Sequence, residues 1–277
     1  MNELALLDWL RRQPGVAGVG DDCAVLNVPR GEELLVTTDQ LVEGVHFRRE
    51  THTAFDCGWK ALARGLSDMA AMGGRPRWAF TSVAAGDARW WQGFQRGLLR
   101  LATRLGVTLA GGDLTHASKT YVDVIVLGTA PRGAAIRRSG ARAGDRIYVS
   151  GPLGRAAARG WRGRPEPRVS LGLKLRGRAT ACIDISDGLA LDLHRLCKES
   201  CVGAEIDAPP IARGATLEQA LHGGEDYELL CTLPPGKRIA GLIPVGCIVA
   251  GPAGRVRFRG RTLPPRGWDP FVHWDSQ

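Results

Sequence analysis

The sequence contains no apolar run that approaches the roughly 20 residues of a membrane-spanning helix. Its first residues, MNELALLDWLRRQ, have the pattern of an amphipathic helix and lack the small-residue cleavage site of a signal peptide. These two absences exclude a protein anchored by membrane helices. We therefore expect a cytoplasmic location and no membrane partner.

The cysteines form no C-x-x-C pair. There are 7 of them, an odd number, and they are scattered through apolar stretches. Cys197 and Cys201, one helical turn apart, are the closest pair. This distribution favours reduced, buried thiols over a disulfide framework or a zinc site.

The net charge of +9 comes mostly from arginines spread along the chain, without a lysine-rich tail or an interleaved aromatic stripe. A nucleic-acid partner is therefore not expected, although the charge alone leaves a non-catalytic nucleotide-binding or nucleic-acid-binding protein open. A positive field also gathers small anionic substrates such as nucleotides.

Two common kinase signatures are missing as well. No G-x-x-x-x-G-K-[ST] motif is present, and neither Lys60 nor Lys119 stands in such a setting. The H-R-D and D-F-G motifs of protein kinases are absent too. The sequence therefore does not support a P-loop enzyme or a protein kinase.

The secondary-structure pattern predicts two α/β domains, residues 1–136 and 137–277, separated near a Gly- and Arg-rich segment. In the first half we expect helices at 54–72 and 88–105 and strands at 32–39, 77–84 and 120–130. In the second half we expect a helix at 187–200 and strands at 146–150, 180–185, 203–207, 227–233 and 243–249. The default ligand site of such a chain is a cleft between the domains.

Acidic residues with neighbouring glycines or hydroxyls follow four of the apolar stretches. The four clusters are Asp21 and Asp22; Thr37, Thr38 and Asp39; Asp113; and Asp184 and Asp187. Any single cluster is more typical of a turn or a helix N-cap, and Ser186 or Asp187 could cap the helix that follows them. Four clusters together favour Mg²⁺ bound between carboxylates and phosphate.

An acceptor that is itself a phosphate would explain why no general base stands out. Phosphate is already an anion at neutral pH, so the protein has only to hold two anions in line while metal ions neutralise their charge. With such an acceptor, the pattern fits phosphoryl transfer between phosphates.

Nine segments, in order along the chain, resemble those of the thiamine-monophosphate kinase family. They are GVGDDCAVL, TTDQLVEGVHF, LSDMAAMGGRP, GGDLT, RSGARAGD, PEPRV, IDISDGLALDL, GGEDYELL and GWDPF. The family is part of the superfamily that includes aminoimidazole ribonucleotide synthetase. The resemblance implies ATP- and Mg²⁺-dependent phosphorylation of thiamine monophosphate to thiamine diphosphate. It also implies an N-terminal mixed sheet with helices that binds ATP and Mg²⁺ and forms a homodimer, a C-terminal α/β domain, and an active site in the cleft.

The resemblance also assigns residues, taken position by position. The metal positions are Asp22, Thr37, Thr38, Asp39, Asp68, Asp113, Asp184 and Asp187, of which Asp113 and Asp187 are the expected catalytic residues. The ATP contacts are Gly112, Asp113, Arg138 and Ser186. The substrate contacts are His46, Glu225 and Trp268.

Each assignment has a structural alternative. Asp68 lies one turn after Arg64 and could form a helix-surface ion pair. His46 could be a structural histidine, Arg138 a surface arginine, and Trp268 a core residue or tail anchor. For the dimer, we expect the apolar strands LLVTTD and YVDVIVLGT to pair across a two-fold axis. A rival function is that of a superfamily relative that uses ATP to activate an amide, a carboxylate or a selenide.

Overall fold

The computed structural model describes residues 3–17 and 23–271. The chain forms two compact units. The first comprises Met1–Met69, Gly74–Gly133 and Arg162–Glu166, and the second comprises Ala70–Gly73, Ala134–Trp161 and Pro167–Gln277. Within the described ranges, no helix combines the length and the apolar character needed to cross a membrane.

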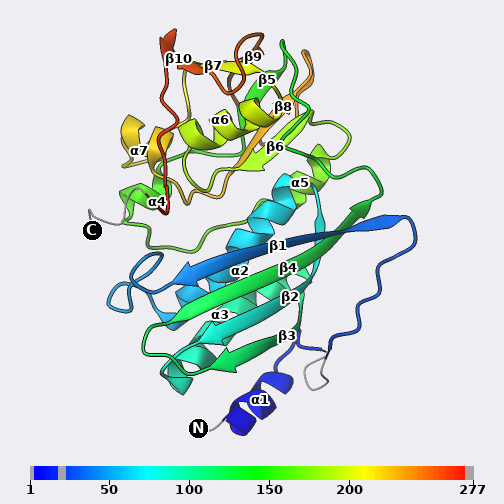
Figure 1. The fold of residues 1–277 in the computed structure, drawn as a ribbon, viewed down its shortest axis with the longest axis vertical. Coiled ribbons are helices and arrows are strands. Elements are labelled where there is room, and N and C mark those ends of the chain that lie inside the picture. Colours follow the sequence, from blue (N-terminus) through cyan, green and yellow to red (C-terminus); the bar gives the residue numbers. More distant parts are fainter. Residues whose placement is uncertain (1–2, 18–22, 272–277) are drawn as a thin grey trace. The chain divides into compact units, whose positions relative to one another are not determined.

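The first unit contains a four-stranded mixed sheet with helices on one face. Its helices are α1 (Glu3–Arg11), α2 (Ala54–Ala71) and α3 (Ala88–Leu105), and its strands are β1 (Glu32–Val42), β2 (Arg75–Ala84), β3 (Thr108–Thr115) and β4 (Tyr121–Pro131). The strand order is β1-β4-β2-β3. Only β2 and β3 are parallel, and α3 connects them as the crossover helix. Figure 1 shows α2 and α3 against the same face of this sheet.

Close contact between α2 and α3 explains two glycines inside these helices. A Cβ atom added at Gly58 would overlap the carbonyl oxygen of Phe94, and one added at Gly97 would overlap that of Phe55. Glycine therefore costs helix propensity here but allows the two backbones to touch. The helices in turn bury the inner face of the sheet, where Val124 and Val126 are fully buried.

The opposite face of this sheet is left without a covering element in the described part of the first unit. On β1, Leu35 and Leu41 point towards the helices and are buried, whereas Leu34 is 44% exposed and Val36 is 59% exposed. We call this surface the open face. Side chains alternate between the two faces of a strand, so consecutive residues of β1 have different surroundings.

The pairing of LLVTTD with YVDVIVLGT across a two-fold axis stays a prediction, and the pairing of strands within one chain limits the form that it can take. β1 pairs with β4 of the same chain over its whole length, from Glu32 opposite Pro131 to Val42 opposite Tyr121. β4 also pairs with β2, so both of its edges are occupied. A dimer contact at β4 would have to use the face of the sheet.

The second unit contains a seven-stranded sheet in the order β11-β10-β7-β9-β5-β8-β6. Its strands are β5 (Arg146–Val149), β6 (Ala181–Asp184), β7 (Gly203–Ile206), β8 (Leu229–Leu233), β9 (Ile243–Val249), β10 (Val256–Phe258) and β11 (Arg261–Thr262). Its helices are α4 (Arg155–Ala158), α5 (Val169–Leu175), α6 (Leu189–Glu199) and α7 (Leu217–His222). β7 and β10 are parallel, and the other neighbouring strands are antiparallel.

The core of the second unit forms where α6 packs on this sheet. Ile147, Ile183, Leu193, Ile206 and Leu230 are all buried in one apolar cluster. β6 ends at Asp184 in the middle of this cluster, and α6 begins only at Leu189. The four residues between them belong to the candidate site described below.

The mixed α/β class predicted from the sequence is confirmed, with a mixed sheet in each unit. Two acidic residues are placed differently from the expectation that they follow strands. Asp39 lies inside β1 and Asp113 lies inside β3, because the pairing with β4 and β2 extends both strands past their apolar stretches.

Candidate active site

Residues 185–187, between β6 and α6, form a segment that we call the ISD loop. Each of its three consecutive carbonyl oxygens accepts a backbone hydrogen bond. The donors, in order along the loop, are the N–H groups of Tyr227, Glu225 and Trp268, at 2.9, 2.7 and 2.9 Å. The loop is therefore fastened through the main chain to two distant segments. Glu225 and Trp268 are the two substrate residues that the resemblance implies for this half of the chain.

The segment that carries Glu225 has an unusual backbone. Glu225 has φ of 55° and Tyr227 has φ of 50°, in the left-handed region that non-glycine residues seldom occupy. Such conformations persist only where surrounding contacts fix them, and they concentrate at functional sites. Here the residues that alternate with them, Asp226 and Glu228, supply those contacts.

Asp226 binds the backbone at the start of α4. Its carboxylate accepts hydrogen bonds from the N–H of Gly154 at 2.5 Å and from the N–H of Ala156 at 3.1 Å. Burial raises the pKa of Asp226, although these hydrogen bonds oppose the effect. Asp226 thereby ties the Glu225 segment to the loop that follows β5.

Glu228 is 5% exposed and is the centre of a charged network. The guanidinium of Arg168 binds both of its oxygens, at 2.8 and 2.5 Å, and Ser150 Oγ donates to it at 2.5 Å. The same Ser150 oxygen accepts from the N–H of Leu229 at 2.7 Å. Bidentate pairing of this kind fixes orientation as well as charge.

The side chain of Asp192, in α6, binds the backbone at the end of the ISD loop. Its Oδ2 accepts from the N–H groups of Asp187 and Gly188, at 3.0 and 3.1 Å. The suggestion that Ser186 or Asp187 caps α6 was wrong, because the N-cap is Gly188 and no side chain caps it. Burial and the nearby charge of Asp187 raise the pKa of Asp192 to about 7.

In the first unit, a second group of acidic residues lies between β1 and α2. Thr37 Oγ1 donates to Asp68 Oδ2 at 2.5 Å, and Arg64 binds Asp39 at 3.2 Å. Burial, together with the charges of Asp68 and Asp123, raises the pKa of Asp39 to about 6 against the opposing effect of Arg64. Arg64 thus pairs with Asp39 across the two elements, and a hydroxyl and two carboxylates lie close together.

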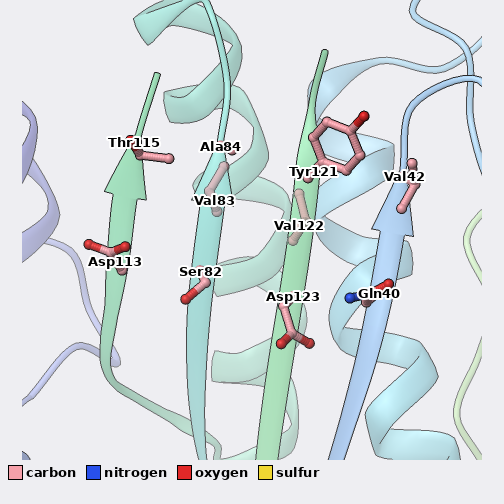
Figure 2. Close-up of a pocket in the computed structure, with 10 residues that line it drawn as sticks. All are labelled: Gln40, Val42, Ser82, Val83, Ala84, Asp113, Thr115, Tyr121, Val122 and Asp123. Atoms are coloured by element: carbon pink, nitrogen blue, oxygen red, sulfur yellow. The ribbon is translucent and has the colours of Figure 1, made fainter. Parts of the chain in front are cut away.

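The open face carries a third polar group, shown in Figure 2. Asp113, Ser82, Asp123 and Gln40 stand in register on the four neighbouring strands, and all four line an open pocket of about 180 Å³. Thr38 Oγ1 also lies here and donates to Asp123 Oδ1 at 2.5 Å. The first unit therefore presents oxygen ligands on both faces of its sheet.

Next to Asp113, the backbone of β3 requires glycine. Gly112 has φ of 157°, and a Cβ atom at this position would overlap the carbonyl oxygen of Thr81 on the neighbouring strand. Gly112 therefore lets β3 approach β2 at the point where Asp113 enters the pocket.

The remaining predicted residues have other surroundings. His46 is half-buried; its Nδ1 accepts from the N–H of Val42 at 3.1 Å, and burial followed by the charges of Arg64 and Lys60 lowers its pKa to about 3. Arg138 is exposed, and its carbonyl oxygen accepts from Ser200 Oγ. Asp22 lies outside the described residues.

The structure therefore brings some predicted residues together and separates others. In the second unit it joins Ser186, Asp187, Glu225 and Trp268 through the ISD loop. In the first unit, Thr37, Asp39 and Asp68 lie on the helix side of the sheet, whereas Thr38 and Asp113 lie on the open face. Among the described residues, no three His, Cys, Asp or Glu side chains converge as a ready-made metal site.

Several polar residues of these groups were not identified from the sequence. Among them are Asp123, Arg168, Asp192 and Glu228. Asp192 offered a usable signal, because it stands inside the apolar frame LALDL, where an aspartate needs a buried partner. The others are defined by contacts between segments far apart in the sequence.

Known proteins resemble this chain over most of its length. The family model described as AIR synthase related protein, N-terminal domain, matches residues 20–130. Thiamine-monophosphate kinase of Salmonella typhimurium is 37% identical over 265 residues, covering 83% of this chain and 80% of the relative. That of Methanospirillum hungatei is 35% identical and covers 99% of this chain and all of the relative.

A solved structure, AaThiL complexed with AMPPCP and TMP, is similar over the same length. It has a TM-score of 0.81 and 30% sequence identity, and it covers 97% of each chain. Similarity of this extent includes both units.

Proposed function

The chain belongs to the thiamine-monophosphate kinase family, and from this premise we propose how its aspartates, with magnesium, perform the reaction. The enzyme transfers the terminal phosphoryl group of ATP to thiamine monophosphate and releases thiamine diphosphate and ADP. The observation that most supports the site is the ISD loop, because Asp187 and the segments of Glu225 and Trp268 meet there through the backbone.

The residues present fit Mg²⁺ that arrives with phosphate. Carboxylate and hydroxyl oxygens are the hard ligands that Mg²⁺ prefers, and it is usually held by one or two carboxylates together with water and substrate phosphates. A set of a few oxygen donors, such as Thr37, Asp39 and Asp68, suits this mode of binding, in which the protein supplies only part of the coordination shell. When bound, the ions supply charge neutralisation for the two phosphates.

We assign the metal positions to three groups. Asp39 and Asp68, with Thr37, form the group between β1 and α2, and their mutual repulsion would be relieved by a cation. Thr38 and Asp113 form the group on the open face, and Asp184 and Asp187 form the group at the ISD loop. Asp22 completes the set implied by the family.

The nucleotide and substrate contacts are taken from the resemblance to the family. Gly112, Asp113, Arg138 and Ser186 are the proposed ATP contacts. His46, Glu225 and Trp268 are the proposed contacts to thiamine monophosphate. An aromatic side chain such as Trp268 suits the thiazolium cation through a cation–π interaction, and Glu225 adds a negative charge.

We propose that transfer is direct, without a phosphoenzyme. The acceptor oxygen belongs to a phosphate and is already deprotonated, so the reaction needs no general base. Burial also raises the pKa values of Cys57, Cys197 and Cys231 to about 12, which keeps these thiols protonated and poorly nucleophilic. The role of the protein is then to hold the two phosphates in line.

A coupled ADP-release assay tests this function. With ATP and Mg²⁺, we expect turnover with thiamine monophosphate and no appreciable turnover with unphosphorylated thiamine, since an alcohol acceptor would need a base. Labelled ATP without acceptor should leave no label on the protein. Faster turnover on thiamine, a covalent phosphoprotein, or turnover only with an amide, carboxylate or selenide acceptor would contradict the proposal.

We further propose that the enzyme is a homodimer formed through the open face. This surface exposes apolar side chains that a monomer would leave in water, including Val36 at 59% and Tyr121 at 48%. Val36→Glu should convert the dimer to a monomer in light scattering at micromolar concentration. Val25→Glu changes another exposed valine, off the sheet, and should leave the dimer intact. A monomeric wild type, or a dimeric Val36→Glu variant, would refute this interface.

The cytoplasmic location expected from the sequence remains a prediction. Fractionation of cells that produce the protein would test it.

A further inference from the structure

Arg195 of α6 lies between two carboxylates at the ISD loop. Its Nη1 contacts Asp187 Oδ2 closely and donates to Asp192 Oδ1 at 2.9 Å. The side chains of Arg195 and Asp187 are 37% and 22% exposed, whereas that of Asp192 is fully buried. The guanidinium thus bridges a buried acid to one that faces solvent.

The bridge is anchored on its buried side. One oxygen of Asp192 binds the N–H groups of Asp187 and Gly188, and the other binds Arg195. Asp192 therefore fixes both the ISD loop and the arginine, independently of the Asp187 side chain. Surface ion pairs without such an anchor usually contribute little, because both side chains must be ordered.

Arg195 contacts one of the two oxygens through which Asp187 would bind a cation. A Mg²⁺ ion binds a carboxylate oxygen at about 2.0–2.1 Å, so it would lie within a few ångströms of the guanidinium and be repelled by it. Arginine remains charged at all physiological pH values, so the conflict is not removed by deprotonation. When a phosphate binds together with the metal, the guanidinium can donate hydrogen bonds to the phosphate oxygens, and this attraction offsets its repulsion of the metal.

We propose that Arg195 is a positioning residue that makes metal binding at Asp187 depend on the nucleotide. Without nucleotide, it is the counter-ion of Asp187 and weakens the binding of a free divalent cation. With nucleotide, it turns its N–H groups to phosphate and strengthens the binding of the metal complex. This inference rests on Asp187 being a metal ligand, as in the proposed function.

The test measures metal binding with and without nucleotide in wild type, Arg195→Met and Arg195→Lys. Free Mn²⁺ is the metal probe, read by electron paramagnetic resonance, and Mg²⁺ with AMPPCP, read by calorimetry, is the nucleotide probe. Repulsion between a partly exposed guanidinium and a cation a few ångströms away corresponds to about a tenfold change in affinity. Arg195→Met should therefore bind free Mn²⁺ about tenfold tighter and Mg²⁺–AMPPCP about tenfold more weakly. Arg195→Lys keeps the charge and should leave Mn²⁺ binding as in wild type.

Arg104→Met is the matched control, because it removes one arginine that pairs with a carboxylate elsewhere, Glu166 at 2.7 Å. It should move neither affinity. Unchanged or weaker Mn²⁺ binding in Arg195→Met, or an equal shift in Arg104→Met, would overturn the proposal. Thiamine-monophosphate kinase activity of the wild type is measured in parallel, so that a failure of the proposed function is seen separately.

Discussion

His46 provides a test of electrostatics that is independent of turnover. Its Nδ1 accepts the N–H of Val42 at 3.1 Å, and its carbonyl oxygen accepts from Nζ of Lys60, a residue only 1% exposed, at 3.0 Å. Protonation of Nδ1 would remove the acceptor and place a positive charge near Lys60 and Arg64. Burial, with these two cations, accordingly lowers the pKa of His46 to about 3. The perturbation is His46→Asn, which retains an acceptor for Val42 but cannot titrate.

The sign of the effect follows from the direction of the pKa shift. The pKa in the folded protein lies below the ordinary value of 6.5, so the unfolded chain takes up the proton first as the pH falls. The stabilisation by neutral His46 is present in full above pH 6.5 and is lost as the pH falls towards 3. Over the 1.5 units from 6.5 to pH 5, at about 1.4 kcal/mol per unit, the loss is about 2 kcal/mol.

Urea unfolding of wild type and His46→Asn at pH 7.5 and pH 5 measures this loss. The other titrating groups contribute similarly to both proteins, so the difference between them isolates His46. We expect the stability of wild type relative to the variant to fall by about 2 kcal/mol between the two pH values, or about 4–8 °C in melting temperature. A difference that is the same at both pH values, or an NMR titration of His46 near pH 6.5, would refute the reasoning.

Three further predictions concern the groups that surround the site. Asp113→Asn should abolish turnover in the ADP-release assay while the melting temperature stays within about 2 °C, because an amide is a poor Mg²⁺ ligand; activity like that of wild type would exclude Asp113 from the metal site. Gly112→Ala should lower the melting temperature and the activity together, because the new Cβ would overlap the Thr81 carbonyl oxygen, whereas an unchanged melting curve would mean that β3 relaxes without cost. Glu228→Gln should destabilise the protein by about 3 kcal/mol in urea unfolding, because it leaves the Arg168 guanidinium without its counter-charge; Glu228→Asp should recover part of the loss, and equal losses in both variants would indicate that charge is not the cause.

The sequence predicted α3 well because its signals are local. The expected range 88–105 is the observed one, with Asp87 accepting the N–H of Arg89 at the start and Gly106 at φ 67° at the end. Apolar spacing and these caps are properties of neighbouring residues, which a single sequence contains.

The sites depended on information that is not local. The sequence grouped Thr37, Thr38 and Asp39 as one cluster, but strand alternation sends Thr38 to the open face and the other two towards α2. The partners of these residues come from distant segments, as Asp123 does for Thr38. The sequence motifs indicated that these side chains offer oxygen ligands for a metal. The pairing and alternation of the strands determine which of them lie on the same face of the sheet.

The same limit applies to Asp187. Its motif is recognisable in the sequence. Its contact with Arg195, however, depends on the direction of α6, which begins after Gly188 without a side-chain cap. The extent of β3 was not predicted, because its second half, GGDLT, has a glycine pair and little β propensity. Pairing with β2 compensates for that composition.

The three main-chain hydrogen bonds on the ISD loop have a consequence for which side chains the positions around it can carry. The loop is held by the N–H groups at positions 225, 227 and 268, which every amino acid except proline can provide. Many replacements of Glu225 and Trp268, the proposed substrate contacts, would therefore keep the backbone contacts with the loop. At position 225, where φ is 55°, glycine and asparagine fit best and β-branched residues fit poorly. If these two side chains set acceptor preference as proposed, an evolving or engineered population could explore that preference while the loop keeps its arrangement, and proline is excluded at both positions because it has no N–H.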